Sequence, residues 1–167
     1  MTTLLLIRHA IAEEREIAAA AGIPDEQRAL TAKGEKRMRQ VAAALAGFVP
    51  ELTLVATSPL RRAVQTAEIV AAACGKVPVV QTPALSPGAD PEAVAQFLQA
   101  RRLAGPCALV GHEPDLGQWL GWALCGTSCA CAQFKKGGAA LLTFPGLPTA
   151  GQGELLWLLT PAQLRDC

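Results

Sequence analysis

Short apolar runs that alternate with helical stripes constrain the fold of this chain more than any other feature. Each run has the length of a strand and the aliphatic composition of a buried one: the runs read TLLLI, LTLVAT, VPVVQ, CALVG, AALLTF and ELLWLL. Between the first five runs, apolar residues recur with the i, i+3, i+4, i+7 spacing of a single buried helical face. Two of these predicted buried stripes are Met38, Val41, Ala42 and Leu45, and Leu60, Val64, Ala67 and Ala71.

Alternation of strand and helix predicts an α/β fold, a three-layer α/β/α sandwich with a mainly parallel central sheet of about six strands. The last two strands are expected to form an antiparallel hairpin. Helix starts are predicted at Thr31, at Ser58-Pro59 and at Asp90-Pro91. Residues 13–28 are predicted to form a loop with one helical turn. The length of 167 residues fits one domain, residues 1–167.

Charge and hydropathy argue against several classes of partner. The formal net charge is +1 and the sequence has no long basic run, so we expect no nucleic-acid or anionic-membrane partner. The apolar run at the N-terminus is much shorter than the roughly 18 to 20 residues that a membrane span needs, and no positively charged leader precedes it. We therefore expect a cytoplasmic protein, and a monomer.

Six cysteines raise the question of a metal cluster or a disulfide framework. Three of them crowd into CGTSCAC as Cys125, Cys129 and Cys131, but a metal cluster would need a fourth ligand, and the only histidines are His9 and His112. Without an export signal, disulfides are not expected. We predict reduced, partly buried thiols and no metal, and the sequence leaves the purpose of the cluster open.

Both histidines and three arginines follow predicted strands. Arg8 and His9 end the first strand, Arg61 and Arg62 fall in the helical turn after LTLVAT, and His112 ends CALVG. The carboxyl ends of parallel strands meet at one edge of a sheet, where ligands bind.

Arginine in the first turn of a helix is disfavoured by the helix dipole, so an anion is expected to compensate for it. A phosphoryl group fits guanidinium forks and helix N–H groups, and an imidazole can attack it as a nucleophile. Because adjacent helical residues point about 100° apart, only one of Arg61 and Arg62 can face the site.

The strand followed by RH, the SPLRRAVQTA segment and the VGHEP segment together resemble the histidine phosphatase superfamily, also called phosphoglycerate mutase-like. The segment RALTAKG, which starts at Arg28, fits the same pattern, and the resemblance covers essentially the whole chain. In LIRHAIAE, LTAKG and GHEPDL the chain is most similar to the short SixA-type phosphohistidine phosphatases.

The resemblance implies a role for each matching residue. His9 is the nucleophile that becomes transiently phosphorylated, and Arg8, Arg62 and His112 bind the phosphoryl oxygens. Arg61 is then a solvated neighbour, and Arg28 lines the mouth of the pocket. The resemblance implies no metal and no other cofactor. To attack, His9 must be neutral at one ring nitrogen, so an acceptor is expected to hold its second N–H.

The proton donor is where the chain departs from the family pattern. Many members carry an acid after the third strand, where this chain reads ALSPGADPEAV. Asp90 is better explained as a helix cap and Glu92 as a first-turn charge, and Glu113 is a further candidate donor. A phosphohistidine substrate would need no donor, because imidazole leaves as a neutral base whose conjugate acid has a pKa of about 6.5.

Three functions stay open at this stage. The first is a phosphatase that removes phosphate from phosphohistidine in a protein. The second is a phosphomonoesterase acting on a small phosphate ester, with one of the three acids as its donor. The third is a catalytically inactive module that binds a phosphorylated partner.

Overall fold

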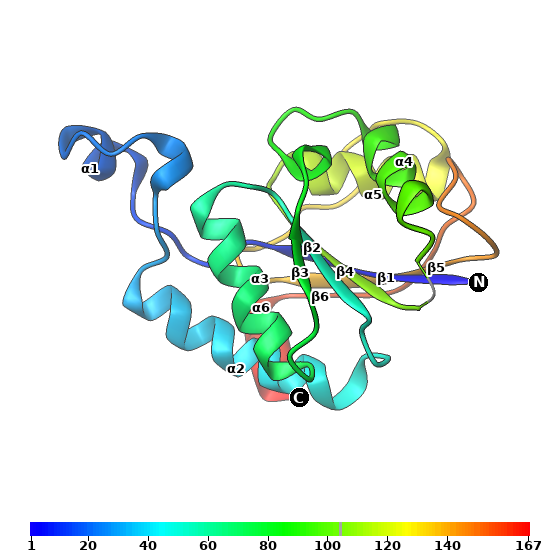
Figure 1. The fold of residues 1–167 in the computed structure, drawn as a ribbon, viewed down its shortest axis with the longest axis horizontal. Helices are drawn as coiled ribbons and strands as arrows, with labels where there is room; N and C mark the ends of the chain where they lie inside the picture. The colour runs from blue at the N-terminus through cyan, green and yellow to red at the C-terminus, as the bar shows by residue number, and fades with distance from the viewer. Residues whose placement is uncertain (104) are drawn as a thin grey trace.

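The computed structural model describes residues 1–103 and 105–167, which form one six-stranded sheet with helices on both faces (Figure 1). The strands are β1 (Thr2–Arg8), β2 (Leu54–Thr57), β3 (Val79–Gln81), β4 (Cys107–Gly111), β5 (Ala139–Phe144) and β6 (Glu154–Leu159). Their order across the sheet is β3-β2-β4-β1-β5-β6. The first four are mutually parallel, β5 runs antiparallel to β1, and β6 runs antiparallel to β5. The predicted fold class and the terminal hairpin are confirmed.

Helices cover both faces of the sheet, as the three-layer prediction requires. The helices are α1 (Arg15–Ala20), α2 (Ala32–Phe48), α3 (Arg61–Ala73), α4 (Pro91–Arg101), α5 (Asp115–Cys125) and α6 (Pro161–Asp166). Two short 3₁₀ helices are η1 (Asp25–Gln27) and η2 (Pro83–Leu85). Helices α2, α3 and α6 pack on one face, and α4 and α5 pack on the other (Figure 1).

The central strand β1 shows how the sequence divides between the two layers. Successive side chains of a strand point to opposite faces, so Leu5 and Ile7 join the core under α2 and α3, while Leu4 and Leu6 join the core under α4 and α5. All four side chains are buried. The unbroken apolar run therefore reflects a strand that is covered on both faces.

The predicted helix starts are built by side-chain caps. Thr31 Oγ1 accepts a hydrogen bond from the Gly34 N–H at 3.0 Å, and Asp90 Oδ1 accepts one from the Glu92 N–H at 2.8 Å. Helix α6 is absent from the sequence prediction, although Thr160 and Gln163 form a capping box at its start.

The two edge strands correct the expectation that every apolar run is a buried strand. Val79 and Val80 of β3 are half-buried, and Leu156 of β6 is 49% exposed. These strands have a neighbour on one side only, so less of each is covered.

The cysteine cluster also differs from its prediction. Cys125, Cys129 and Cys131 are exposed free thiols rather than partly buried ones. The residues that the structure describes include no group of three or more histidine, cysteine or acidic side chains arranged to hold a metal ion. Among the same residues, no helix is both long and apolar enough to cross a membrane.

Residues 12–30 form an arm that projects from the body of the protein and carries α1 and η1 (Figure 1). The two ends of the arm are paired. Ala12 and Leu30 form an antiparallel bridge, and the Glu13 N–H donates to the Ala29 carbonyl at 2.9 Å. The segment predicted as a loop with one helical turn is thus a closed excursion that returns to its starting point.

Candidate active site

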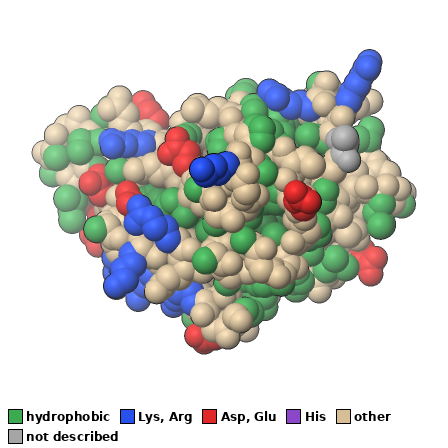
Figure 2. All heavy atoms as spheres, turned by 60° about the horizontal axis from the view of Figure 1, so that its bottom comes forward, with side chains coloured by type: hydrophobic (Ala, Val, Ile, Leu, Met, Phe, Trp, Pro, Cys, Tyr) green, Lys and Arg blue, Asp and Glu red, His purple; other side chains and the backbone are tan. Residues whose placement is uncertain are grey.

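The four residues expected to bind and attack a phosphoryl group lie together at the carboxyl edge of the parallel strands. Arg8 is the last residue of β1 and His9 follows it, Arg62 lies in the first turn of α3, and His112 follows β4. All four line one cleft of about 420 Å³, and the centroids of the two imidazole rings are 5.1 Å apart. The arm forms one wall of this cleft. Charged side chains of both signs gather on the arm side of the face shown in Figure 2.

His9 is held in one tautomer by the backbone. Its Nδ1 lies 2.7 Å from the Ala10 carbonyl oxygen, which can only accept, so Nδ1 carries the proton and Nε2 keeps its lone pair. Burial, together with the positive charges of Arg62 and Arg8, lowers the pKa of His9 to about 3. The ring is therefore neutral near pH 7, with one nitrogen available for attack.

His112 is oriented by a hydroxyl group. Its Nε2 lies 2.8 Å from Ser58 Oγ, at the end of β2. Burial first, and then the charge of Arg62, lower the pKa of His112 to about 4. Its Nδ1 is buried and makes no hydrogen bond with the described part of the chain. The Ser58 hydroxyl can donate to Nε2, and in that tautomer the proton is on Nδ1, which is then a donor for an oxyanion. From the sequence, Ser58 was seen only as part of a helix start.

Arg62 faces the cleft and Arg61 faces solvent. Arg62 is 4% exposed, whereas Arg61 is an exposed residue. Arg62 is buried along with Ala63, Thr66 and Val70, so the buried stripe of α3 is rotated from the one predicted through Leu60 and Val64, both of which are only half-buried.

Asp25 anchors Arg62 and Arg28 from the arm. Arg62 Nη1 donates to the Asp25 carbonyl at 2.8 Å, and Arg62 Nη2 donates to Asp25 Oδ2 at 3.2 Å. Arg28 Nε donates to Asp25 Oδ1 at 2.9 Å, and its Nη1 donates to the Glu13 carbonyl at 2.6 Å. Burial alone would raise the pKa of Asp25, but the Arg28 hydrogen bond and the Arg62 charge hold it below its usual value. Sequence reasoning did not identify Asp25.

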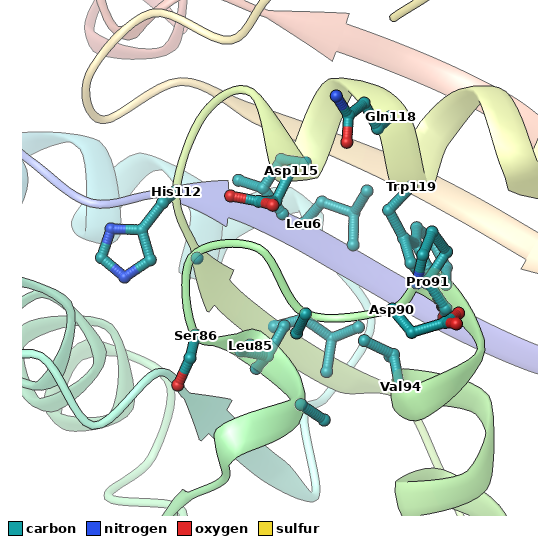
Figure 3. Close-up of a pocket in the computed structure, with 15 residues that line it drawn as sticks. Leu6, Leu85, Ser86, Asp90, Pro91, Val94, His112, Asp115, Gln118 and Trp119 are labelled. Atoms are coloured by element: carbon teal, nitrogen blue, oxygen red, sulfur yellow. Dashed lines mark hydrogen bonds between the residues drawn. The ribbon is translucent and has the colours of Figure 1, made fainter. Parts of the chain in front are cut away.

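The three candidate proton donors do not share one place. Glu113 lines the cleft, whereas Asp90 and Glu92 do not. Asp90 caps α4 and borders a separate cavity of about 30 Å³ that also reaches His112. Asp90 and His112 lie at opposite ends of that cavity (Figure 3). The structure therefore brings only Glu113, of the three, to the side of the imidazoles.

This arrangement is suited to covalent transfer of a phosphoryl group. A neutral imidazole nitrogen is available as the nucleophile, and two guanidinium groups and a second imidazole surround it as donors. Such donors neutralise the charge that spreads over the equatorial oxygens in a loose, in-line transition state. Arg8 and His112 come from the ends of the neighbouring strands β1 and β4, and Arg62 comes from the helix that follows β2, the next strand in the sheet.

Comparison with known proteins gives the family. A family model of the histidine phosphatase superfamily (branch 1) matches residues 4–86, a range that includes Arg8, His9 and Arg62. An uncharacterized protein of Picosynechococcus sp. is 43% identical over 120 residues, which cover 70% of this chain and 69% of that protein.

Solved structures agree with this placement. The protein histidine phosphatase SixA, solved with tungstate, has a TM-score of 0.79 and 26% identity, and the match covers 97% of this chain and 99% of that one. A phosphoserine phosphatase from Entamoeba histolytica, solved with 3-phosphoglyceric acid, has a TM-score of 0.64 and covers 96% of this chain and 98% of that one. At 19% identity, the second match bears on the fold alone. With its fold, its paired histidines and its matching N-terminal half, the chain belongs to the histidine phosphatase superfamily and is a phosphatase of that group.

Proposed function

We propose that this phosphatase removes phosphate from phosphohistidine in a protein and forms a phospho-His9 intermediate. In the first step, Nε2 of His9 attacks phosphorus, the bond to the substrate imidazole breaks, and that imidazole leaves as a neutral base. In the second step, water attacks the phosphorus of phospho-His9 and releases inorganic phosphate. Arg8, Arg62 and His112 stabilise the oxygens in both steps.

One observation carries the choice of a P–N substrate: Asp25 and Glu113, the cleft carboxylates that contact Arg62 and the backbone holding Arg8, both serve as hydrogen-bond acceptors. Asp25 accepts from Arg28 and Arg62, and its lowered pKa keeps it ionised near pH 7. Glu113 Oε1 accepts from the Phe134 N–H at 2.9 Å. An alkoxide leaving group needs a proton; ionised Asp25 has none to give, and Oε1 of Glu113 is already bound as an acceptor. A protonated phosphohistidine has no such need.

The similarity to SixA, described as a protein histidine phosphatase, supports the same substrate class. The cleft is also consistent with it. Its volume of about 420 Å³ and its outer wall on the projecting arm leave room for a side chain presented by another protein.

A small-molecule phosphomonoesterase is the second candidate, and one feature of Glu113 favours it. Burial raises the pKa of Glu113 above its usual value, which is the direction required of a general acid. On this alternative, Glu113 donates the proton to an ester leaving group.

Phosphate release separates the two functions. The purified protein is compared on a phosphohistidine-bearing protein domain and on a panel of sugar phosphates, nucleotides and other phosphomonoesters, with His9→Ala as the blank. We expect a preference for the P–N substrate that disappears in His9→Ala. A preference for an ester that also depends on His9 would refute the proposed substrate and support the alternative.

A further inference from the structure

Glu113 sits at the junction between the phosphoryl-binding residues and α5. It directly follows His112, and its Oε1 accepts from the Phe134 N–H at 2.9 Å. Glu113 Oε2 also lies beside Gly117, in the first turn of α5, at 3.2 Å from the position that a Cβ of this residue would take. The Glu113 side chain therefore joins the start of a helix to the segment that precedes β5.

The backbone of Phe134 in turn holds Arg8. Arg8 Nη1 donates to the Phe134 carbonyl oxygen at 2.7 Å. Among the described residues, the Phe134 carbonyl is the hydrogen-bond acceptor for the Arg8 guanidinium. The Nε atom of Arg8 is buried and has no partner among them. Phe134 itself is 1% exposed, so its ring anchors the peptide in the core under α4 and α5.

The segment that carries Phe134 depends on contacts with α5. A Cβ added at Gly117 would collide with the carbonyl of Ala132, and one added at Gly121 would collide with the carbonyl of Cys129. These two glycines, four residues apart on one face of α5, let the irregular chain lie directly against the helix. That chain has no strand pairing of its own between α5 and β5, so side-chain contacts such as the one from Glu113 fix its position.

We infer that Glu113 is a positioning residue for Arg8, which it holds through the Phe134 backbone, and not the proton donor of the reaction. This inference rests on the proposed function, because it concerns the same site. The charge of Glu113 has a second effect. Burial lowers the pKa of Arg8, and the Glu113 carboxylate raises it again. Glu113 thus fixes where the guanidinium lies and helps to keep it charged.

The experiment compares Glu113→Gln with Glu113→Ala on a phosphohistidine-bearing protein domain and on an alkyl phosphate. The amide oxygen of glutamine can still accept from the Phe134 N–H, whereas alanine leaves that group unpaired. For Glu113→Ala we expect kcat/KM to fall about 100-fold on both substrates, since a misplacement of about 1 Å has an effect of that order. For Glu113→Gln we expect a fall of at most about tenfold, because the bond from the Phe134 N–H is kept and only the carboxylate charge is lost.

A general acid gives a different result. Both variants would then lose activity equally on the alkyl phosphate and keep it on the P–N substrate, and this outcome would overturn the inference. Unchanged kcat/KM in Glu113→Ala would also overturn it. Glu92→Ala is the matched control, because Glu92 is an exposed glutamate outside the cleft and its loss is expected to change neither substrate.

Binding of tungstate, measured by calorimetry, gives a readout that does not depend on turnover. We expect Glu113→Ala to bind tungstate at least about tenfold more weakly than the unmodified protein, and Glu113→Gln to retain most of the affinity. Equal tungstate affinity in all three proteins would overturn the positioning role. If Glu113→Ala does not fold, Glu113→Met keeps the length of the side chain without an acceptor. An unmodified protein that binds tungstate but releases no phosphate would refute the proposed function and leave the inference about Arg8 standing.

Discussion

Replacement of Asp25 by alanine is the most informative perturbation of the site, because Asp25 supplies the carboxylate that pairs with a buried guanidinium. Arg62 is 4% exposed, and its two hydrogen bonds go to the carbonyl and the carboxylate of Asp25, at 2.8 and 3.2 Å. Asp25→Ala keeps the first of these bonds and removes the second. It also removes the 2.9 Å bond to Arg28.

The size of the effect follows from burial. Removing one member of a fully buried ion pair costs about 3–5 kcal/mol. The side chain of Asp25 is 39% exposed, so solvent screens part of the interaction, and we expect the free energy of unfolding to fall by about 1–2 kcal/mol.

Denaturation in urea measures this change, and a double-mutant cycle with Arg62→Ala isolates the pair. We expect a coupling free energy of about 1 kcal/mol or more at pH 7. Since the pKa of Asp25 is lowered in the folded protein, its stabilising effect is present above the unfolded value and is lost as the pH falls through the folded value. A coupling free energy near zero at pH 7 would refute the idea that the arm anchors Arg62 through Asp25.

Two further predictions concern stability. The pKa is about 3 for His9 and about 4 for His112, below the unfolded value of about 6.5. As the pH falls, the unfolded chain therefore binds protons before the folded protein does. The free energy of unfolding should fall by a few kcal/mol between about pH 6.5 and pH 4. Urea denaturation across this range should show a shallower slope for His9→Gln, and equal slopes would contradict the assignment. In α2, Gly34→Ala should destabilise the protein by about 1–3 kcal/mol, because the added Cβ would collide with the Ile11 carbonyl. The Cβ of Gly47→Ala would meet nothing within 4 Å, and this substitution should stabilise the protein by about 0.5–1 kcal/mol. Thermal denaturation of the pair checks both signs, and a stabilised Gly34→Ala would show the reasoning to be wrong.

The layers of the fold could be predicted because they depend on local patterns. A strand buried on both faces gives an unbroken apolar run, and a helix that covers one face gives a stripe such as Met38, Val41 and Leu45, all of which are buried. The gathering of Arg8, His9, Arg62 and His112 at one edge follows from the same patterns, because parallel strands end at the same side of a sheet.

The remaining parts of the site depend on contacts that no local pattern encodes. Asp25 is 37 residues from Arg62, Ser58 is 54 from His112, and Phe134 is 126 from Arg8. Each of these partners lies in a single-turn 3₁₀ helix or an irregular segment, where hydrophobic periodicity carries no information about the course of the chain. Helix α6 is different, because Thr160 and Gln163 give a capping signal that sequence reasoning could have used.

The pairing between the two ends of the arm determines which parts of the cleft wall can change in sequence without disturbing the site. Because Ala12 and Leu30 are bridged, the chain between them leaves the body of the protein and returns to the same point. Insertions or deletions near Gly22, between α1 and η1, change the length of a closed loop, which costs little free energy and does not shift β1, the strand that precedes His9. Asp25 and Arg28 tie the returning half of the arm to the site, and Arg15 of the outgoing half donates to Asp25 Oδ1 at 3.2 Å, so the exposed residues of α1 after Arg15 are the part that is free to vary. Evolution or a protein engineer can therefore alter what docks at the cleft by rewriting the exposed residues between 16 and 22, while the sheet and Asp25 keep the chemistry in place.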